Sequence, residues 1–247
     1  PVPPVTDLVV VKEMDVRLTQ GTIAYHSCRL SHPDLYALDV LADLLGSGES
    51  SRLVADLKTK RNLVLGIEAW NATPDWPGGE FAVRFACTPD KTDQVRAAVA
   101  EHLAAVCRQA PLAEEVEKVK RQKISQQVMS LRTASSQARA LAGDVLGLGD
   151  PYFSARYAEN IQKVTPEDVL RVARKYLQGT RSITVLVQPK SGAAQAAQVA
   201  PVARPTTARI ALPESGLTLL VHRTPGQPAV SMIAAMKAGQ SIETAET

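Results

Sequence analysis

The residues that could hold a catalytic metal in this chain are four histidines, and their spacing keeps them apart. A zinc peptidase places two histidines four residues apart on one helix, beside a glutamate that activates the bound water. Neither H-x-x-E-H nor H-E-x-x-H occurs in the sequence. The histidines are His26, His32, His102 and His222. None has a second histidine at the required distance, so the sequence predicts no metal site within this chain.

The patterns of nucleophilic catalysis are missing as well. Cys28, Cys87 and Cys107 form no C-x-x-C pair, and their odd number argues against a disulfide framework. We interpret them as small buried hydrophobic residues. No G-x-S-x-G is present, and Gly46-Ser47-Gly48 lacks the Gly-Lys-Ser/Thr ending of a phosphate loop. The sequence therefore indicates no catalytic residue.

Two further groups of residues have simple structural interpretations. Asp34, Asp39 and Asp43 follow one another at near-helical spacing, which a polar helix face explains. Trp70 and Trp76 flank a predicted hairpin turn. They could form an aromatic binding spot, but packing against the hairpin is the interpretation that we prefer.

The composition is that of an ordinary folded protein and excludes several classes. The chain has 247 residues, 45% hydrophobic and 21% charged, with a formal net charge of +3. These values exclude disordered, collagen-like and disulfide-dense chains, and the length is ample for a core in one or two domains. No apolar run reaches the roughly 18 residues of a membrane span. The small charge gives no indication of nucleic acid or an anionic membrane as a partner.

Hydrophobic periodicity predicts a strand, two helices and a hairpin in the first part of the chain. Residues 16–25 have a strand pattern with a possible bulge at Gly21. A helix begins at 33–34, and its apolar residues repeat at helical spacing up to Gly46, a residue typical of a helix end. After a second helix, strand patterns at 63–70 and 81–87 flank a turn rich in proline and glycine. We expect these two strands to pair as an antiparallel hairpin.

Helices dominate residues 91–177, and a strand at 183–187 closes the pattern. Thr165 is the expected N-cap of the last helix, with Pro166 at its first position and Asp168 at its third. Strands and helices do not alternate regularly along the chain. The sequence therefore predicts an α+β fold with a largely antiparallel sheet covered by helices.

Composition divides the chain into three segments. Residues 1–190 carry the predicted fold, and 191–207 are a linker rich in alanine, glutamine and proline. Residues 208–247 contain two alternating apolar patterns, at 217–221 and 230–236, but are too few for a core of their own. Because exposed apolar strands favour association, we expect 208–238 to pair with a sheet edge of this chain or of a partner in a homodimer.

An ordered set of motifs supports a family resemblance. Leu44-Leu45-Gly46-Ser47-Gly48 is followed by Ser51-Arg52-Leu53. This pattern resembles the L-G-x-G-x-x-S-R-L signature of the insulinase/pitrilysin family of zinc metallopeptidases, the inverzincins. Further similar segments occur in the family's order at 34–38, 149–152, 164–169 and 183–189.

The resemblance implies a metallopeptidase-like (LuxS/processing-peptidase-like) domain. Family members are built from pairs of similar α+β domains, with H-x-x-E-H in the first. Residues 1–190 resemble the second, non-catalytic domain, and 208–247 resemble the truncated start of a following peptidase-like domain. The resemblance therefore implies no cofactor in this segment and a zinc ion in the parent protein outside it.

Two positions correspond to substrate-binding residues of the family. Catalytic assemblies use an arginine and a tyrosine, in the pattern Leu-Arg-x6-Tyr, to hold the substrate and the transition state. The matching residues here are Lys58 and Leu65. Lysine lacks the planar fork of arginine, and leucine has no hydroxyl to donate. We therefore expect no transition-state contact from this domain, and Lys58 to be an exposed charge.

The function implied by the resemblance is that of a non-catalytic domain of a zinc metalloendopeptidase, which shapes the chamber wall and binds peptide. The alternative is a structural or assembly domain of a non-peptidase relative. Expected partners are the other domains of the parent and its peptide substrate. The family also suggests a bacterial periplasm or cell envelope.

Overall fold

The fold comes from a computed structural model, which describes residues 7–73, 78–190, 206–212 and 217–223. The elements, in chain order, are β1 (Leu8–Met14), β2 (Thr19–Ser27), α1 (Leu35–Gly46), the π-helix η1 (Val54–Lys60), β3 (Gly66–Ala72), β4 (Gly79–Cys87), the 3-10 turn η2 (Pro89–Lys91), α2 (Thr92–Arg108), α3 (Ala113–Ser130), α4 (Ala134–Leu148), α5 (Phe153–Gln162), α6 (Pro166–Tyr176), β5 (Ser182–Pro189), β6 (Thr206–Leu212) and β7 (Leu217–Arg223).

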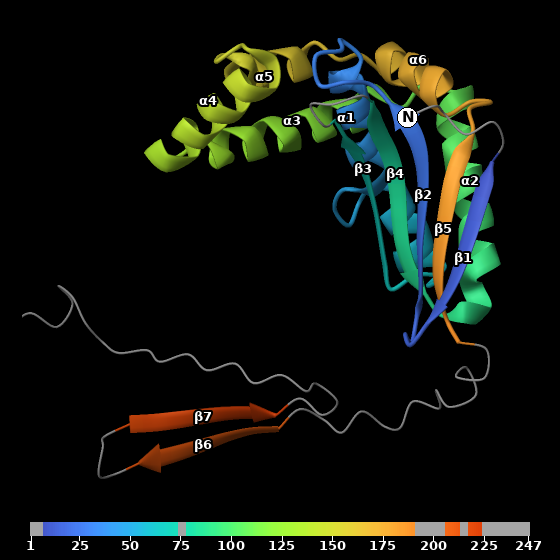
Figure 1. The fold of residues 1–247 in the computed structure, drawn as a ribbon, viewed down its shortest axis with the longest axis vertical. Helices are drawn as coiled ribbons and strands as arrows, with labels where there is room; N and C mark the ends of the chain where they lie inside the picture. Colours follow the sequence, from blue (N-terminus) through green and yellow to red (C-terminus); the bar gives the residue numbers. More distant parts are fainter. Residues whose placement is uncertain (1–6, 74–77, 191–205, 213–216, 224–247) are drawn as a thin grey trace, which may run out of the picture. The chain divides into compact units, whose positions relative to one another are not determined.

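A five-stranded sheet organises the first part of the chain. Its strand order is β1-β5-β2-β4-β3 (Figure 1), and every pair is antiparallel except β1 with β5. The expected α+β fold with a largely antiparallel sheet is therefore confirmed. β1 was not predicted, because its four consecutive apolar residues, 8–11, show no alternation of polar and apolar positions.

Helices cover one face of this sheet. Phe81, Val83 and Phe85 of β4 point to that side and are at most 1% exposed, in one core with Leu38 and Leu41 of α1. Figure 1 shows α1 and α2 behind the strands. The alternate side chains of the strands face the other way, where no helix of the described residues packs. We call this surface the open face.

Two glycines permit close packing between elements. A Cβ atom on Gly21 would lie 2.2 Å from the Phe85 ring, and one on Gly46 would lie 2.1 Å from the backbone nitrogen of Ala69. Gly21 lies in regular register between β4 and β5, so the predicted bulge is wrong. Gly46 is the last residue of α1 and lets the helix approach β3. The helix therefore ends at Gly46 as predicted, and the missing side chain also permits this close approach.

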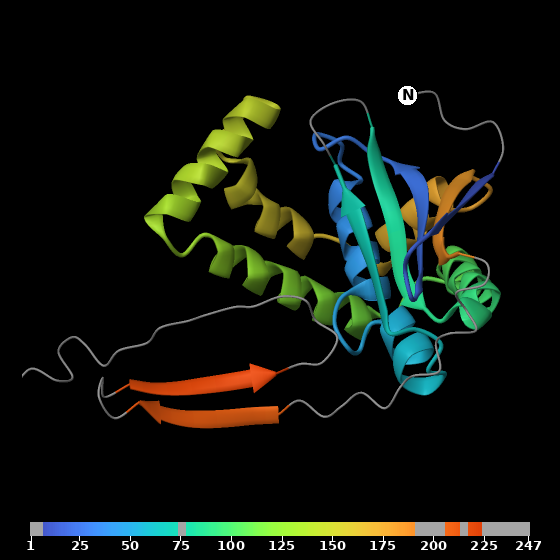
Figure 2. The same cartoon turned by 60° about the horizontal axis from the view of Figure 1, so that its bottom comes forward.

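The helices between β4 and β5 differ in how deeply they are buried. α6 packs on α1 and α2, and its predicted cap is confirmed, since the Thr165 hydroxyl accepts a hydrogen bond from Asp168 N at 3.1 Å. α4 has a single buried residue, Asp144, and projects from the sheet (Figure 2). Among the described residues, no helix is long and apolar enough to cross a membrane.

The contacts divide the chain into two units, Pro1–Ala196 and Ala197–Thr247. In the second unit, β6 and β7 form an antiparallel pair with Thr206 opposite Arg223. β7 is the strand predicted at 217–221, whereas β6 begins within the last two residues of the predicted linker. The pattern at 230–236 lies outside the described residues.

Candidate functional site

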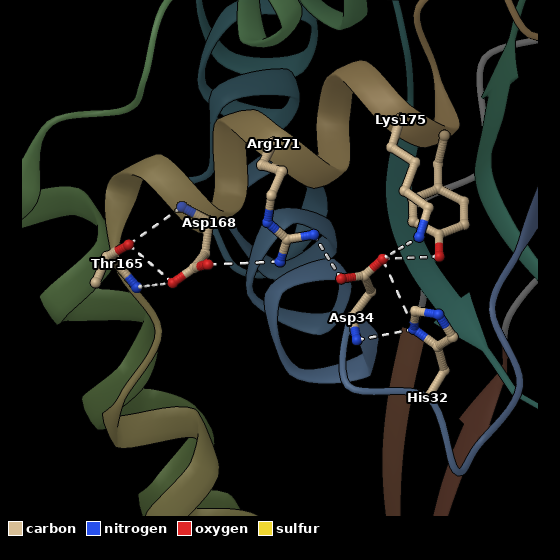
Figure 3. Close-up of polar contacts among 7 residues, drawn as sticks. His32, Asp34, Thr165, Asp168, Arg171 and Lys175 are labelled. Carbon is tan, nitrogen blue, oxygen red and sulfur yellow. Dashed lines mark hydrogen bonds and ion pairs between the residues drawn. The ribbon is translucent and has the colours of Figure 1, made fainter.

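The first polar centre is built around Asp34, at the N-terminus of α1 (Figure 3). Asp34 is 3% exposed, and its carboxylate accepts hydrogen bonds from Arg171 Nη1 at 2.6 Å, Lys175 Nζ at 2.7 Å and Tyr176 Oη at 2.9 Å. Burial by itself raises the pKa of Asp34, but the hydrogen bonds from Lys175, Arg171 and Tyr176 outweigh it and lower this pKa to about 2. An ionised carboxylate therefore joins α1 to α6.

The sequence of α6 explains why it can hold this carboxylate. Arg171 and Lys175 are four residues apart and project from one side of the helix. Arg171 also lies 3.4 Å from Asp168, whose other carboxylate oxygen accepts from the Thr165 hydroxyl at 2.8 Å. The contacts thus form a continuous chain from the helix cap to Asp34 (Figure 3).

Asp39 and Asp43 make two further connections of α1. Asp39 accepts from Asn71 Nδ2 at 2.8 Å and from the hydroxyl of Tyr157, while Asp43 pairs with Lys123 Nζ at 2.9 Å. Burial raises the pKa of Asp39, and burial together with the Asp39 charge raises the pKa of Tyr157. The three aspartates, interpreted from the sequence as a polar helix face, thus make contacts within the fold. Each one attaches α1 to a different element.

The family-signature residue Arg52 has a structural contact. Its Nε and Nη2 atoms donate to the two carboxylate oxygens of Glu115 at 3.0 and 2.6 Å. Glu115 also accepts from Leu112 N at 3.0 Å, which caps the start of α3. The hydrogen bond from Arg52 lowers the pKa of Glu115. This part of the signature therefore fixes the segment before η1 to α3.

The two predicted substrate positions lie on the surface and do not converge. The Lys58 side chain is 40% exposed and pairs with Glu49 at 2.8 Å. Leu65 is 61% exposed, and its backbone N–H donates to the Ala86 carbonyl at 2.8 Å as β3 begins. Neither side chain contacts the other in any interaction of the described residues.

The histidines of the described residues are dispersed. His32 Nδ1 accepts from Asp34 N at 3.0 Å, and His102 Nε2 lies 2.9 Å from Asp56 Oδ2. His26 is on β2, and the side chain of His222 is outside the described set. Among the described residues, no three His, Cys, Asp or Glu side chains are placed to hold a metal ion. The residues that the structure describes therefore do not fit a zinc site.

The open face carries a second set of polar contacts, at β3 and β4. Arg84 lies over the Trp70 ring at 5.3 Å and donates from Nε to Glu68 at 2.6 Å. Trp70 donates from Nε1 to Glu80 at 3.1 Å. Beside them a shallow pocket of about 400 Å³ includes Gln20 in its lining. Trp70 therefore packs on the hairpin, as predicted, whereas Trp76 lies outside the described residues.

The register aligns side chains in rows across this face. One row runs from β1 to β3 through Leu8, Ile183, Ala24, Ala82 and Trp70. The open face therefore carries apolar side chains at β1 and β5, small side chains in the middle, and charged and aromatic side chains near β3. A sheet surface of this kind can contact an extended chain over several residues.

Much of this arrangement could not be found from the sequence. Asp34 and Arg171 are separated by 137 residues, and Asp39 and Tyr157 by 118. Arg171 and Lys175 have a four-residue spacing that is visible in the sequence, but it gives no indication of their partner.

Comparisons with known proteins agree with this geometry. Residues 1–123, about half of the chain, match the family model described as the peptidase M16 inactive domain. The chain is 25% identical over 185 residues to the zinc protease PqqE of Helicobacter pylori, covering 73% of this chain and 40% of that protein.

Two solved structures show the same fold. A protease from Helicobacter pylori is 25% identical, with a TM-score of 0.67 over 73% of this chain and 44% of that one. A peptidase M16 inactive domain from Pseudomonas fluorescens is 18% identical, with a TM-score of 0.69 over 77% and 45%. The chain thus spans less than half the length of these relatives.

Proposed function

We propose a function from the premise that the chain belongs to the insulinase/pitrilysin (M16) family of zinc peptidases and carries that family's inactive domain. In its parent protein, this domain is a non-catalytic wall of a proteolytic chamber and binds extended peptide there. The parent reaction is zinc-dependent hydrolysis of peptide bonds, with the zinc ion and the glutamate that acts as general base outside this chain.

The observation that carries the proposal is the one-sided covering of the sheet. Helices pack on one face, while the open face presents Leu8, Val185, Arg84 and other exposed side chains from all five strands. Monomeric domains rarely expose a broad apolar surface without a partner or ligand. A rigid sheet surface of this kind suits the wall of a chamber that holds an unfolded peptide.

The domain positions and binds the peptide, and it supplies no catalytic group to the bond that is cleaved. Lys58 is engaged by Glu49, and Leu65 offers only a hydrocarbon side chain. We propose that neither residue contacts the transition state. The ion pairs of Asp34 and Arg52 hold the helices against the sheet and so keep the open face rigid.

The proposal is tested by blocking the open face in the intact parent. Gln20→Cys places an exposed thiol on this face, and Glu101→Cys places one on α2, on the helix side. The native cysteines of this chain are buried, and the unsubstituted parent treated with the same bulky maleimide measures any labelling elsewhere. We expect labelling at position 20 to lower kcat/KM for peptide cleavage about tenfold, and labelling at position 101 to leave it unchanged. Equal effects at both positions, or no effect at either, would contradict the proposal.

An assembly role is the second candidate, and the exposure of α4 favours it. Leu141, Val145 and Leu146 on this helix are 47%, 49% and 86% exposed. Such a helix can pack against another protein. A parent protein that binds no zinc and cleaves no peptide, but needs Leu146 for a stable complex, would support this role over the chamber wall.

A further inference from the structure

β1 is an edge strand with an unusual pattern of exposed side chains. It pairs with β5 alone among the described strands. Leu8, Val9, Val10 and Val11 are 47%, 47%, 42% and 54% exposed, although all four are large and apolar. Edge strands of soluble proteins are normally short, charged or covered. Among the described residues no strand lies at the other edge of β1, which we call the free edge, and the four consecutive apolar residues 8–11 are therefore suited to accept another strand there.

The ladder with β5 shows which backbone groups face outward. The Met14 carbonyl accepts a hydrogen bond from Lys190 N, so Met14 faces β5. In a parallel ladder, residues two apart point the same way, and Val10 therefore also faces β5. The backbone N–H and C=O groups of Val9 and Val11 point to the free edge. These four groups are the hydrogen-bonding positions that an added strand would use.

The first four side chains of β1 are apolar on both faces of the strand, and the charged Lys12 and Glu13 follow them. Leu8 and Val10 stand beside Ile183 and Val185 on the open face. Val9 and Val11 project to the opposite side. A strand added at this edge would therefore place successive residues against apolar neighbours on both faces. It would gain most from apolar side chains at consecutive positions.

We propose that β1 binds an extended apolar peptide as an additional strand, held by the backbone groups of Val9 and Val11. This inference rests on the proposed function, and it specifies where the peptide binds and which peptides fit. The added strand would extend the open face, because Leu8 belongs to the row that crosses the sheet to Trp70. β3, the other edge, presents the charged Glu68 to that face and packs against η1.

A second copy of this chain fits the edge less well than a peptide. If two β1 strands paired antiparallel with full overlap, Val9 would lie opposite Glu13 and Val10 opposite Lys12. Charged side chains would then lie next to apolar ones along the pair, which is unfavourable. A peptide whose apolar residues lie opposite residues 8–11 avoids this mismatch.

Fluorescence anisotropy of a labelled peptide tests the proposal on this chain. The probe is about eight residues long, to match the strand, and consists of valine and leucine between terminal lysines. Because β1 is apolar on both faces, either edge of the peptide can pair. We expect N-methylation of every second residue to preserve binding, and N-methylation of every residue to weaken it at least about tenfold.

Variants of Val11 provide the matching test on the protein. Val11→Pro removes an N–H at the free edge and leaves the ladder with β5 intact, while Val11→Thr keeps that N–H. We expect the proline variant to lose binding and the threonine variant to retain it, with thermal unfolding confirming that both fold. If the proline variant does not fold, the N-methylated peptides alone decide the question.

Three outcomes would overturn the proposal: no binding of the probe, binding that ignores N-methylation, or dimerisation through β1 in sedimentation. The proposed function can be judged separately. If Val11→Pro leaves cleavage by the parent unchanged while a label at position 20 blocks it, the result supports the chamber-wall function and contradicts peptide binding at β1.

Discussion

Gly21 and Phe85 lie directly opposite each other on β2 and β4, and the phenyl ring occupies the space that a side chain at position 21 would need. A Cβ atom on Gly21 would approach Phe85 Cζ to 2.2 Å. The ring is 1% exposed and lies in the core beneath the central strands. The Phe85 ring therefore fits in the core only because residue 21 has no side chain.

The first prediction follows from this contact. Gly21→Ala should destabilise the domain by about 1–3 kcal/mol, because the ring must move in a filled core. Urea unfolding gives the free energy of unfolding. The double variant Gly21→Ala with Phe85→Leu should be more stable than the sum of the single changes predicts. Simple additivity would show that the two positions do not compete for space.

The second prediction concerns acid stability through Asp34. Its folded-state pKa of about 2 lies below the ordinary value of 3.8. The ionised form therefore stabilises the fold above about pH 4, and this contribution, roughly 2 kcal/mol, is lost as the pH falls from 4 towards 2. Asp34→Asn should lower the free energy of unfolding at pH 6 and flatten its fall in acid. Asp15→Asn, at an exposed carboxylate, serves as the control. Parallel pH curves for the two variants would contradict this account.

The third prediction concerns the two-bond contact between Arg52 and Glu115. Arg52→Lys preserves the charge but cannot reproduce the planar pair, so we expect a loss of about 1 kcal/mol. A double-mutant cycle with Glu115→Gln measures the coupling of the two side chains. A coupling energy near zero would mean that the signature arginine has another role.

The fourth prediction concerns Lys58. It is exposed and paired with Glu49, so Lys58→Ala should change the stability by less than about 0.5 kcal/mol. Cleavage by the parent should keep its kcat/KM within about twofold, because this side chain has no part in transition-state binding. A tenfold loss of kcat/KM with unchanged stability would contradict this expectation and show that Lys58 contributes to substrate binding.

Elements with a local signal were predictable from the sequence. Thr165 and Asp168 are three residues apart, and their capping contacts follow from that spacing. The alternation of Phe81, Val83 and Phe85 likewise predicted the buried side of β4. In both cases the determining residues lie within one element.

Features that depend on distant residues were not predictable. Asp34 looked like part of a polar helix face, because Arg171 and Lys175 are far away in the chain. β1 gave no alternation, because a strand that is apolar on both sides matches no two-residue period. Gly21 suggested a bulge, since a single sequence does not show which ring lies opposite.

The parallel pairing of β1 with β5 also has a consequence for the order of folding during synthesis. Asp7 accepts a hydrogen bond from Ser182 N, 175 residues later in the chain. β1, the first strand of this sheet to be synthesised, must therefore wait for β5, the last strand of the same sheet. At roughly 5–20 residues per second, that delay is on the order of ten seconds or more. During this time its four apolar residues have no partner within the sheet, and a nascent-chain chaperone that shields this segment would increase the yield of folded protein.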